Sequence, residues 1–268
     1  MEVNIADHKF TIIWDGVYYF ALSDYPNISK WELAKLLAFM EYERKWGRQT
    51  KIVCQNADIL DAINHAVANP ETVKDVPVPC KITECTACFH NGCYTQFVCH
   101  TAPFEAVKNI LTSGKLLSAS KAFGKPAKDL VAEVRNAAGD PADFFEYVML
   151  SWGNCWAGDR LIMERKLGMI PTEEQLQNSF SPGVRFYFRY SDIKNHPEYV
   201  FDGYHPAKVK DELEISNRHS IIIPQEYKGE LEKWVHPSMA QHVYYLSYKG
   251  LGIFDWNRQV YEFVNTIA

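Results

Sequence analysis

The pattern of hydrophobic and polar positions changes its period several times along the chain. Near the start, KFTIIWDGVYYFAL (residues 9–22) forms two β-rich, alternating runs on either side of Asp15-Gly16. Alternation predicts strands, and Asp-Gly is among the strongest short indications of a two-residue hairpin turn. We therefore expect a β-hairpin close to the N-terminus.

A helical period follows the hairpin. Over residues 29–47 apolar side chains recur three or four positions apart, and Ser29 with Glu32 fits a capping box at the start of the helix. A short strand and a second helix, which Pro70 ends, come next. We therefore expect residues 1–75 to form a small α/β unit.

Residues 76–93 have no clear period and contain several prolines and cysteines, so they are predicted to be a Cys-rich linker. From residue 94 onward, strand and helix patterns alternate again, and residues 94–268 are expected to form the main domain. Its predicted elements are a strand at 94–98, a helix at 104–113, a polar helix at 125–140, a helix turning to strand at 141–152, a helix at 157–167, strands at 183–190, 211–224 and 241–248, and a helix at 254–264.

Composition limits the classes of protein to which the chain can belong. Its 268 residues carry a net charge of −5, which argues against binding nucleic acid through a generally basic surface. The N-terminus lacks the regions of a signal peptide, and no apolar run approaches the roughly 20 residues that span a bilayer. Seven cysteines, an odd number, favour thiols or metal ligands over disulfides. We therefore expect a cytoplasmic protein without a membrane partner.

The junction between the strand at 94–98 and the next helix carries the most informative residues. The strand is expected to end at His100, Thr101 is a candidate N-cap for the helix, and Gly114 is its expected stop. A histidine fixed between two rigid elements can point into a cleft with both ring nitrogens available. The alternative is an interior histidine beside a helix that only packs the core.

This junction resembles the first motif of the ADP-ribosyltransferase superfamily, most closely that of the DarT-type DNA ADP-ribosyltransferases. The residues that match in order are His100, Thr101, Asn109, Ile110, Leu111, Gly114 and Leu116. In that family the histidine hydrogen-bonds the adenosine ribose of NAD, and the backbone of the next residue holds the nicotinamide amide. The resemblance implies an α+β fold with an ADP-ribosyltransferase-like split antiparallel β-sheet core and flanking helices, with NAD as the substrate.

A second segment, FFEYVMLSW, resembles the family strand that supplies an aromatic wall for nicotinamide. Tyr147 and Val148 match the motif, and Trp152 stands where a further aromatic is expected. An electron-rich ring would stabilise the cationic nicotinamide. Whether Tyr147 or Trp152 does so stays open, because the two residues lie on opposite faces of a strand. The basic residue that the family places after this motif corresponds to Arg160.

The third matching segment is VKDELEIS, where the family has a glutamate on a late strand. Glu212 fits that position, and Glu214 follows on the same face of the strand. Cleavage of the bond between nicotinamide and ribose builds positive charge on the ribose, which a fixed carboxylate stabilises. A second carboxylate could orient or deprotonate the acceptor. The alternative is two acids that face solvent.

The cysteines of the linker form a separate candidate site. The segment CKITECTACFHNGC brings four thiols within fourteen residues, and the CxxC pair has the spacing of a zinc-binding half-site. The candidate ligands of a structural zinc ion are Cys80, Cys85, Cys88 and Cys93. The alternative is a thiol-rich segment without metal.

Together these motifs predict an NAD-dependent mono-ADP-ribosyltransferase that releases nicotinamide. The macromolecular acceptor, a nucleic-acid base of DNA or RNA or a protein side chain, stays open, as does any antitoxin partner. The prediction requires His100 and Glu212 to face each other across one crevice. Basic residues such as Arg185 and Lys208 could bind the NAD pyrophosphate or simply be solvated. The alternative functions are an RNA 2′-phosphotransferase-like enzyme and a non-catalytic, zinc-stabilised binding module.

Overall fold

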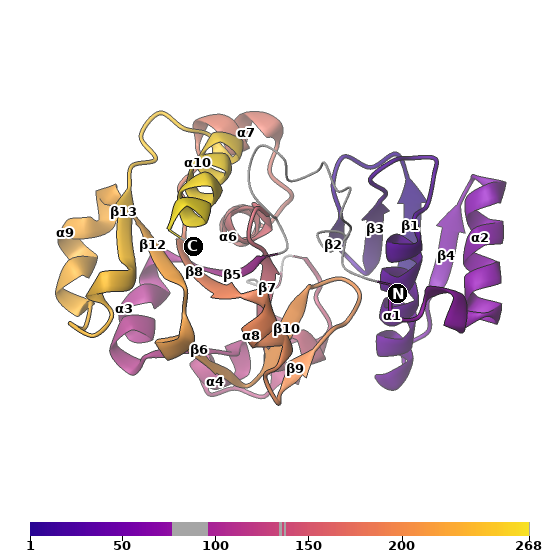
Figure 1. The fold of residues 1–268 in the computed structure, drawn as a ribbon, viewed down its shortest axis with the longest axis horizontal. Helices are drawn as coiled ribbons and strands as arrows, with labels where there is room; N and C mark the ends of the chain where they lie inside the picture. The colour runs from indigo at the N-terminus through magenta and orange to yellow at the C-terminus, as the bar shows by residue number, and fades with distance from the viewer. Residues whose placement is uncertain (77–95, 134–135, 137, 268) are drawn as a thin grey trace.

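The computed structural model describes residues 1–76, 96–133, 136 and 138–267 (Figure 1). Thirteen strands and ten α-helices occur within these residues. The strands are β1 (Glu2–Ala6), β2 (Ile12–Trp14), β3 (Val17–Ala21), β4 (Lys51–Cys54), β5 (Phe97–Ala102), β6 (Lys115–Leu117), β7 (Tyr147–Trp152), β8 (Val184–Arg189), β9 (Tyr199–Val200), β10 (Ala207–Lys210), β11 (Glu212–Glu214), β12 (Ser220–Pro224) and β13 (Val243–Leu246). The helices are α1 (Lys30–Lys45), α2 (Ala57–Ala68), α3 (Phe104–Ser113), α4 (Ala119–Phe123), α5 (Ala127–Val131), α6 (Ala157–Leu167), α7 (Glu173–Asn178), α8 (Tyr190–Lys194), α9 (Lys228–Leu231) and α10 (Ile253–Thr266).

The N-terminal unit, residues 1–76, contains a four-stranded sheet in the order β2-β3-β1-β4. The predicted hairpin is confirmed, since β2 and β3 pair antiparallel around Asp15 and Gly16, both of which have positive φ. The predicted capping box is also confirmed, because the Ser29 hydroxyl accepts from the Glu32 amide and the Glu32 carboxylate accepts from the Ser29 amide. Strand β1 was not predicted from the sequence, and it pairs parallel with both β3 and β4.

The large sheet has seven strands in the order β13-β12-β8-β5-β7-β10-β9. Neighbouring strands are antiparallel except β12 and β13, so the predicted α+β class is confirmed. One face of this sheet packs against α3, α8, α9 and the two-stranded pair of β6 and β11. Its core is formed by buried side chains such as Val98, Phe186, Leu213 and Ile221.

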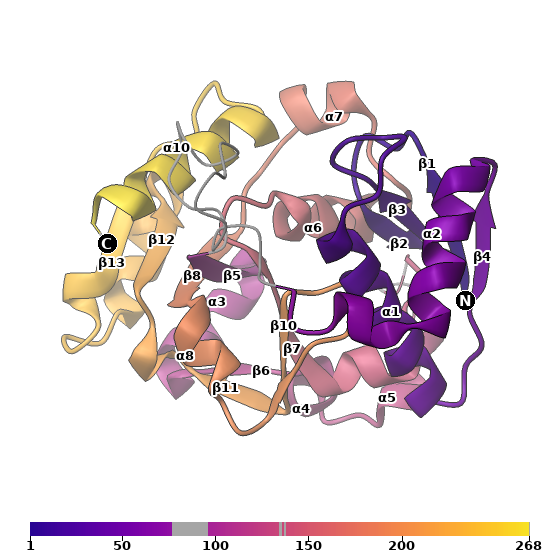
Figure 2. The ribbon, with the colours of Figure 1, turned by 45° about the vertical axis from the view of Figure 1, so that its right-hand side comes forward.

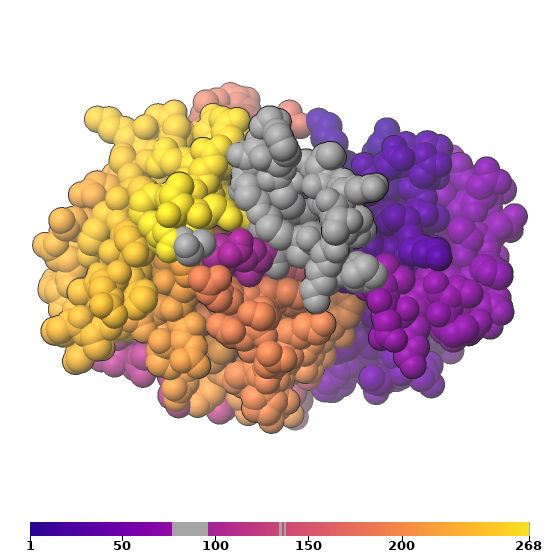
Figure 3. All heavy atoms as spheres, in the orientation of Figure 1, coloured from indigo at the N-terminus to yellow at the C-terminus, as the bar shows by residue number. Residues whose placement is uncertain are grey.

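Two different bodies cover the opposite face of the large sheet (Figures 1 and 2). Over β5, β8 and β12 lie α6, α7 and α10, whose Met163, Leu176 and Trp256 share a core with Phe97. Near β7 and β10 lies the N-terminal unit instead, and Met149 packs into that unit's core. Figure 3 shows the N-terminal unit, indigo to purple, meeting the orange segment around β9 and β10. The boundary between the two bodies therefore falls at the neighbouring strands β5 and β7.

The junction at His100 differs from the prediction. The strand does not end at His100, and Thr101 does not cap the helix, because β5 continues to Ala102 and stays paired with β8 through Ala102 and Val184. The N-cap position of α3 is Pro103, without a side-chain hydrogen bond. Gly114 ends this helix in a left-handed conformation, as predicted.

The single strand predicted over residues 211–224 is also wrong. Residues Glu212–Glu214 form β11, which pairs with β6, whereas β12 belongs to the large sheet. Between them a short 3-10 helix, Ile215–Asn217, turns the chain, and the Ile215 amide donates to the Gly114 carbonyl at 2.9 Å. Because that bond ties the turn to the end of α3, the segment cannot run on as one extended strand.

Two other expectations concern segments that the structure describes only in part or not at all. The polar helix expected over 125–140 is helical over Ala127–Val131. The four candidate zinc ligands, Cys80, Cys85, Cys88 and Cys93, lie outside the described residues. Within the described part of the chain, no helix combines the length and apolar character needed to cross a membrane.

Candidate functional site

His100 lies in β5. This strand and its neighbour β7 form the boundary between the part of the sheet covered by α6, α7 and α10 and the part covered by the N-terminal unit. It is partly buried, and its Nδ1 lies 3.0 Å from the carbonyl oxygen of Met149. A carbonyl can only accept, so Nδ1 carries the proton, and in the neutral ring Nε2 is then an acceptor. Burial is the main cause that lowers the pKa of His100, which favours this neutral form.

The strands β5 and β7 diverge next to His100. Their pairing consists of Val98 with Trp152 and Cys99 with Ser151, and it ends there. The Gly153 amide donates to the Phe97 carbonyl at 2.8 Å, so the odd-numbered residues of β5 direct their peptide groups toward β7. By this alternation, the next peptide group to face β7 belongs to Thr101.

The main-chain N–H and C=O of Thr101, which we call the peptide edge of Thr101, face this divergence. Continuing the register by two residues would place Met149 opposite Thr101. The pairing does not continue, and the Met149 carbonyl accepts from the His100 ring instead. A donor and an acceptor that normally complete a sheet ladder are therefore presented side by side at the split.

Two glycines hold Thr101 in place from the opposite face of the sheet. A Cβ atom at Gly158, in the first turn of α6, would lie 2.3 Å from Thr101 Oγ1. A Cβ atom at Gly183 would lie 2.7 Å from Thr101 Cγ2 and 2.6 Å from the Ala102 carbonyl oxygen. Because no side chain fits at either position, α6 and the chain before β8 approach β5 closely enough to fix Thr101.

The two aromatic candidates of β7 occupy opposite faces of the strand, as alternation predicted. Trp152 packs at the edge of the same core as Val98, which is the face that His100 shares, and its ring meets Tyr190 at a centroid distance of 5.0 Å. The ring of Tyr147 faces the other way, with its centroid 4.7 Å from Lys208 Nζ. Trp152 is therefore the aromatic residue on the His100 face.

Arg160 is buried in α6, where its Nη1 lies 3.3 Å from the Glu164 carboxylate. Its guanidinium also lies against the rings of Phe10 and Trp156, at 5.1 and 5.5 Å. Two other basic candidates also form buried ion pairs. Arg185 pairs with Asp159, and Lys208 pairs with Asp202. The suggested pyrophosphate role of Arg185 and Lys208 is therefore wrong, since neither side chain reaches the surface.

Glu212 and Glu214 lie on the solvent side of β11, flanking buried Leu213. The Glu212 carboxylate pairs with Lys115 Nζ at 2.5 Å and with Lys121 Nζ at 3.2 Å. These two lysines, Lys115 first, lower the pKa of Glu212 and keep it ionised. Glu214 is more exposed and lies 3.9 Å from Lys115.

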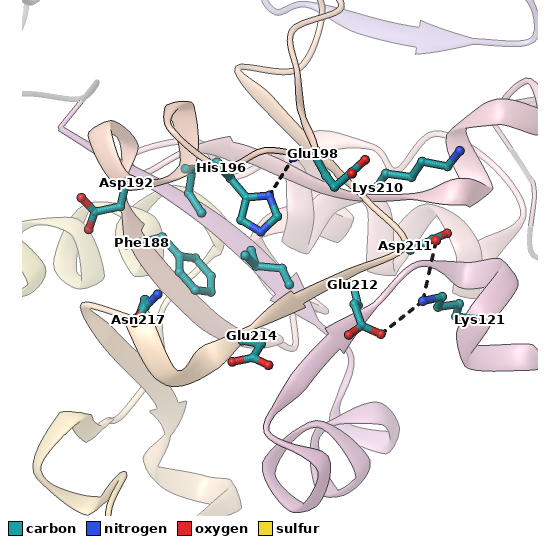
Figure 4. A pocket seen from close by; sticks show the side chains of 12 residues that line it. Lys121, Phe188, Asp192, His196, Glu198, Lys210, Asp211, Glu212, Glu214 and Asn217 are labelled. Atoms are coloured by element: carbon teal, nitrogen blue, oxygen red, sulfur yellow. Dashed lines mark hydrogen bonds and ion pairs between the residues drawn. The ribbon is translucent and has the colours of Figure 1, made fainter.

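Both glutamates line a cavity of about 650 Å³ between β11, α8 and β10 (Figure 4). Its carboxylates are Asp192, Glu198, Asp211, Glu212 and Glu214. Among the described residues, the lysines that line it are Lys121 and Lys210, so carboxylates outnumber ammonium groups there. A cavity of this charge favours a cationic group over an anionic one.

His196 contributes the imidazole of this cavity. Its Nδ1 accepts from the Glu198 backbone amide at 3.1 Å, which leaves the proton of the neutral ring on Nε2. Figure 4 shows the ring between Phe188 and Glu198, on the cavity side of the chain. His196 was not among the residues predicted from the sequence, because NHPE is not a recognisable motif and the residue shares a cavity with Glu212 only through the fold.

The structure thus groups the predicted residues in two places. His100, Thr101 and Trp152 belong to adjoining stretches of β5 and β7, and Glu212 and Glu214 share the acidic cavity. The lining of that cavity includes neither His100 nor Trp152, so this cavity does not join His100 to Glu212. Comparisons with protein-family models, curated proteins and solved structures find no match.

Proposed function

We propose that this protein binds NAD and transfers ADP-ribose to a macromolecular acceptor, with release of nicotinamide. The observation that carries the proposal is the peptide edge of Thr101, which faces the divergence of β5 and β7. A primary carboxamide, such as that of nicotinamide, offers one carbonyl acceptor and one amide donor side by side. It can therefore pair with the N–H and C=O of Thr101 much as a neighbouring strand would.

His100 and Trp152 complete this half of the proposed site. With Nδ1–H committed to the Met149 carbonyl, the Nε2 lone pair of His100 can accept from a ribose hydroxyl. Trp152 lies on the same face of the sheet, and its indole suits the cationic nicotinamide ring. These roles agree with the ones that the ADP-ribosyltransferase resemblance assigns to His100 and to an aromatic residue of this strand.

The transfer itself needs a stabilised cation. The bond between nicotinamide nitrogen and ribose breaks, nicotinamide leaves with the electron pair, and the ribose develops positive charge. A lone pair of the acceptor then forms the new bond to ribose, and the acceptor loses a proton. In the proposal, the ribose next to nicotinamide lies between the peptide edge of Thr101 and the acidic cavity, where ionised Glu212 stabilises the ribosyl cation and Glu214 accepts the proton.

Calorimetric titration with NAD and with nicotinic acid adenine dinucleotide tests the binding step. The acid analogue has a carboxylate in place of the carboxamide and cannot donate to the Thr101 carbonyl. We expect NAD to bind at least about tenfold more tightly, since one lost hydrogen bond of about 1.4 kcal/mol corresponds to that factor. His100→Ala should weaken NAD binding as well. Equal binding of both dinucleotides, or no binding of NAD, would overturn the proposal.

Release of nicotinamide, followed by chromatography, tests the reaction. Wild-type protein with NAD and either single-stranded DNA, RNA or a protein mixture should release nicotinamide and label one acceptor class from NAD that carries an isotope in its adenylate. Bound NAD that stays intact with all three acceptors would contradict transferase activity while leaving the binding step standing.

A further inference from the structure

Two side chains of the N-terminal unit contact the segment that leads into β7: Tyr42 of α1 and Arg48 of the loop after it. The Tyr42 hydroxyl donates to the carboxylate of buried Asp143, just before β7. Arg48 joins the same carboxylate at 2.5 Å and also pairs with buried Glu43 at 2.6 Å. The unit is therefore tied to the segment that leads into β7 by charged hydrogen bonds rather than by apolar contact alone.

Tyr42 also covers the ammonium group of Lys208 on β10. Lys208 Nζ lies 3.8 Å from the centroid of the Tyr42 ring and 2.8 Å from the Asp202 carboxylate. The rings of Phe144 and Tyr147 lie 4.6 and 4.7 Å from the same nitrogen. Both partners of the ion pair are fully buried. The three aromatic rings and the Asp202 carboxylate therefore fix the position of the ammonium group.

Asp202 belongs to the loop between β9 and β10, which packs onto the N-terminal unit. Its carboxylate accepts from the backbone amides of Tyr204 and His205 at 2.9 and 2.7 Å. The next residue, Gly203, has φ +77, and a Cβ atom there would lie 2.2 Å from the Lys35 carbonyl oxygen of α1. The loop backbone at Gly203 therefore packs directly on α1, and the position of Asp202 depends on that contact.

Lys208 is connected to His100 through one intervening residue. In the pairing of β7 with β10, Lys208 stands opposite Met149. The Met149 carbonyl is the acceptor that holds the His100 ring, and the Met149 side chain packs into the core of the N-terminal unit. The contacts from Tyr42 to Lys208, from Lys208 to Met149 and from Met149 to His100 are therefore continuous.

We propose that the N-terminal unit is part of the NAD site, with Tyr42 and Lys208 as positioning residues. On the same face of the sheet, the unit holds β7 at Met149, while α6, α7 and α10 hold the neighbouring strand β5. This arrangement keeps the strands apart at the peptide edge of Thr101 and fixes the His100 ring. The consequence for NAD rests on the proposed function, whereas the consequence for the His100 ring does not.

The test compares Lys208→Met and Tyr42→Ala with Tyr19→Phe, a control in the same unit that does not contact Lys208. The first readout is the ring ¹⁵N and Nδ1–H signals of His100 in histidine-labelled protein, assigned with His100→Gln. The second readout is NAD affinity by calorimetry. We expect both test variants to fold, to shift the His100 signals and to bind NAD roughly ten- to a hundredfold more weakly, whereas Tyr19→Phe resembles wild type.

The two readouts separate the possible failures. Unchanged His100 signals in folded Lys208→Met and Tyr42→Ala overturn the positioning role, whatever happens to NAD. If wild-type protein does not bind NAD but the His100 signals shift in both variants, the positioning of the ring is supported and the proposed function fails. Where Tyr42→Ala does not fold, Tyr42→Phe, which keeps the ring and loses the bond to Asp143, replaces it and should give a smaller shift of the same signals.

Discussion

The Nδ1–H group of His100 donates a hydrogen bond to the carbonyl oxygen of Met149. Met149 is the residue that would stand opposite Thr101 if β5 and β7 stayed paired. One side-chain hydrogen bond thus replaces a ladder bond and marks where the two halves of the large sheet separate. The same contact sets the tautomer of the imidazole and presents the peptide edge of Thr101. The proposed recognition of NAD follows from this relationship.

Stability should depend on pH through His100. Burial lowers the pKa of the folded-state imidazole below its ordinary value of 6.5, so the unfolded chain takes up a proton more readily. The free energy of unfolding should therefore fall as the pH drops below about 6.5. Urea denaturation of His100→Gln between pH 7 and pH 5 should show a shallower fall than wild type.

A second histidine serves as a comparison for this experiment. The pKa of His219 is also lowered, mainly by burial, so His219→Gln should reduce the pH dependence separately. A His100→Gln variant whose stability falls as steeply as that of wild type would show that the ring is not held in its neutral form.

Removing the carboxylate of the buried Lys208–Asp202 pair should destabilise the fold strongly, whereas Asp202 without Lys208 keeps its hydrogen bonds from the Tyr204 and His205 amides. Asp202→Ala leaves the buried ammonium group of Lys208 without its carboxylate, at an expected cost of roughly 3–5 kcal/mol. In contrast, Asp255→Ala breaks an exposed pair with Arg258 and should cost no more than about 1 kcal/mol. Urea denaturation measures both. Similar losses in the two variants would mean that the buried pair does not anchor the loop.

The close approach of α6 to Thr101 predicts an effect of adding a single methyl group. Gly158→Ala would place a Cβ atom 2.3 Å from Thr101 Oγ1, so it should cost roughly 1–3 kcal/mol and weaken NAD binding. Gly229→Ala in α9 is the matched control, because no atom beyond its chain neighbours and its own helix backbone lies within 4 Å of its Cβ position. Thermal unfolding should show a lower midpoint for the first variant and an equal or higher one for the second.

Glu212 and Glu214 should differ in their effect on nicotinamide release. Glu212→Gln removes the anion from the group held by Lys115 and Lys121, and release should slow by about a hundredfold. Glu214→Gln removes the neighbouring, more exposed carboxylate and should have a smaller effect. Single-turnover assays with protein in excess over NAD compare them. If Glu212→Gln is as active as wild type, another carboxylate must stabilise the ribosyl cation.

Local signals in the sequence were sufficient for the elements whose ends depend on neighbouring residues. Asp15-Gly16 and the Ser29–Glu32 capping box predicted the hairpin and the start of α1, because both are set by contacts within a few residues. Gly114 likewise ends α3 in a left-handed conformation, as predicted.

Features that depend on distant strands could not be predicted in this way. Thr101 had the composition of an N-cap, but pairing with β8 keeps it extended. The apolar alternation of residues 211–224 did not reveal that β11 and β12 join different sheets, since only their partners distinguish them. Burial of Lys208 was equally hidden, because Tyr42, Phe144 and Asp202 surround it from three separate segments.

Hydrogen exchange at the backbone amide of Thr101, followed by NMR, tests the central claim most directly. Without ligand, this amide should exchange faster than that of Cys99, whose peptide group faces a paired residue of β7. NAD should slow the exchange at Thr101, and nicotinic acid adenine dinucleotide should slow it much less. A Thr101 amide that is already protected without ligand, or one that NAD leaves unchanged, would contradict the account.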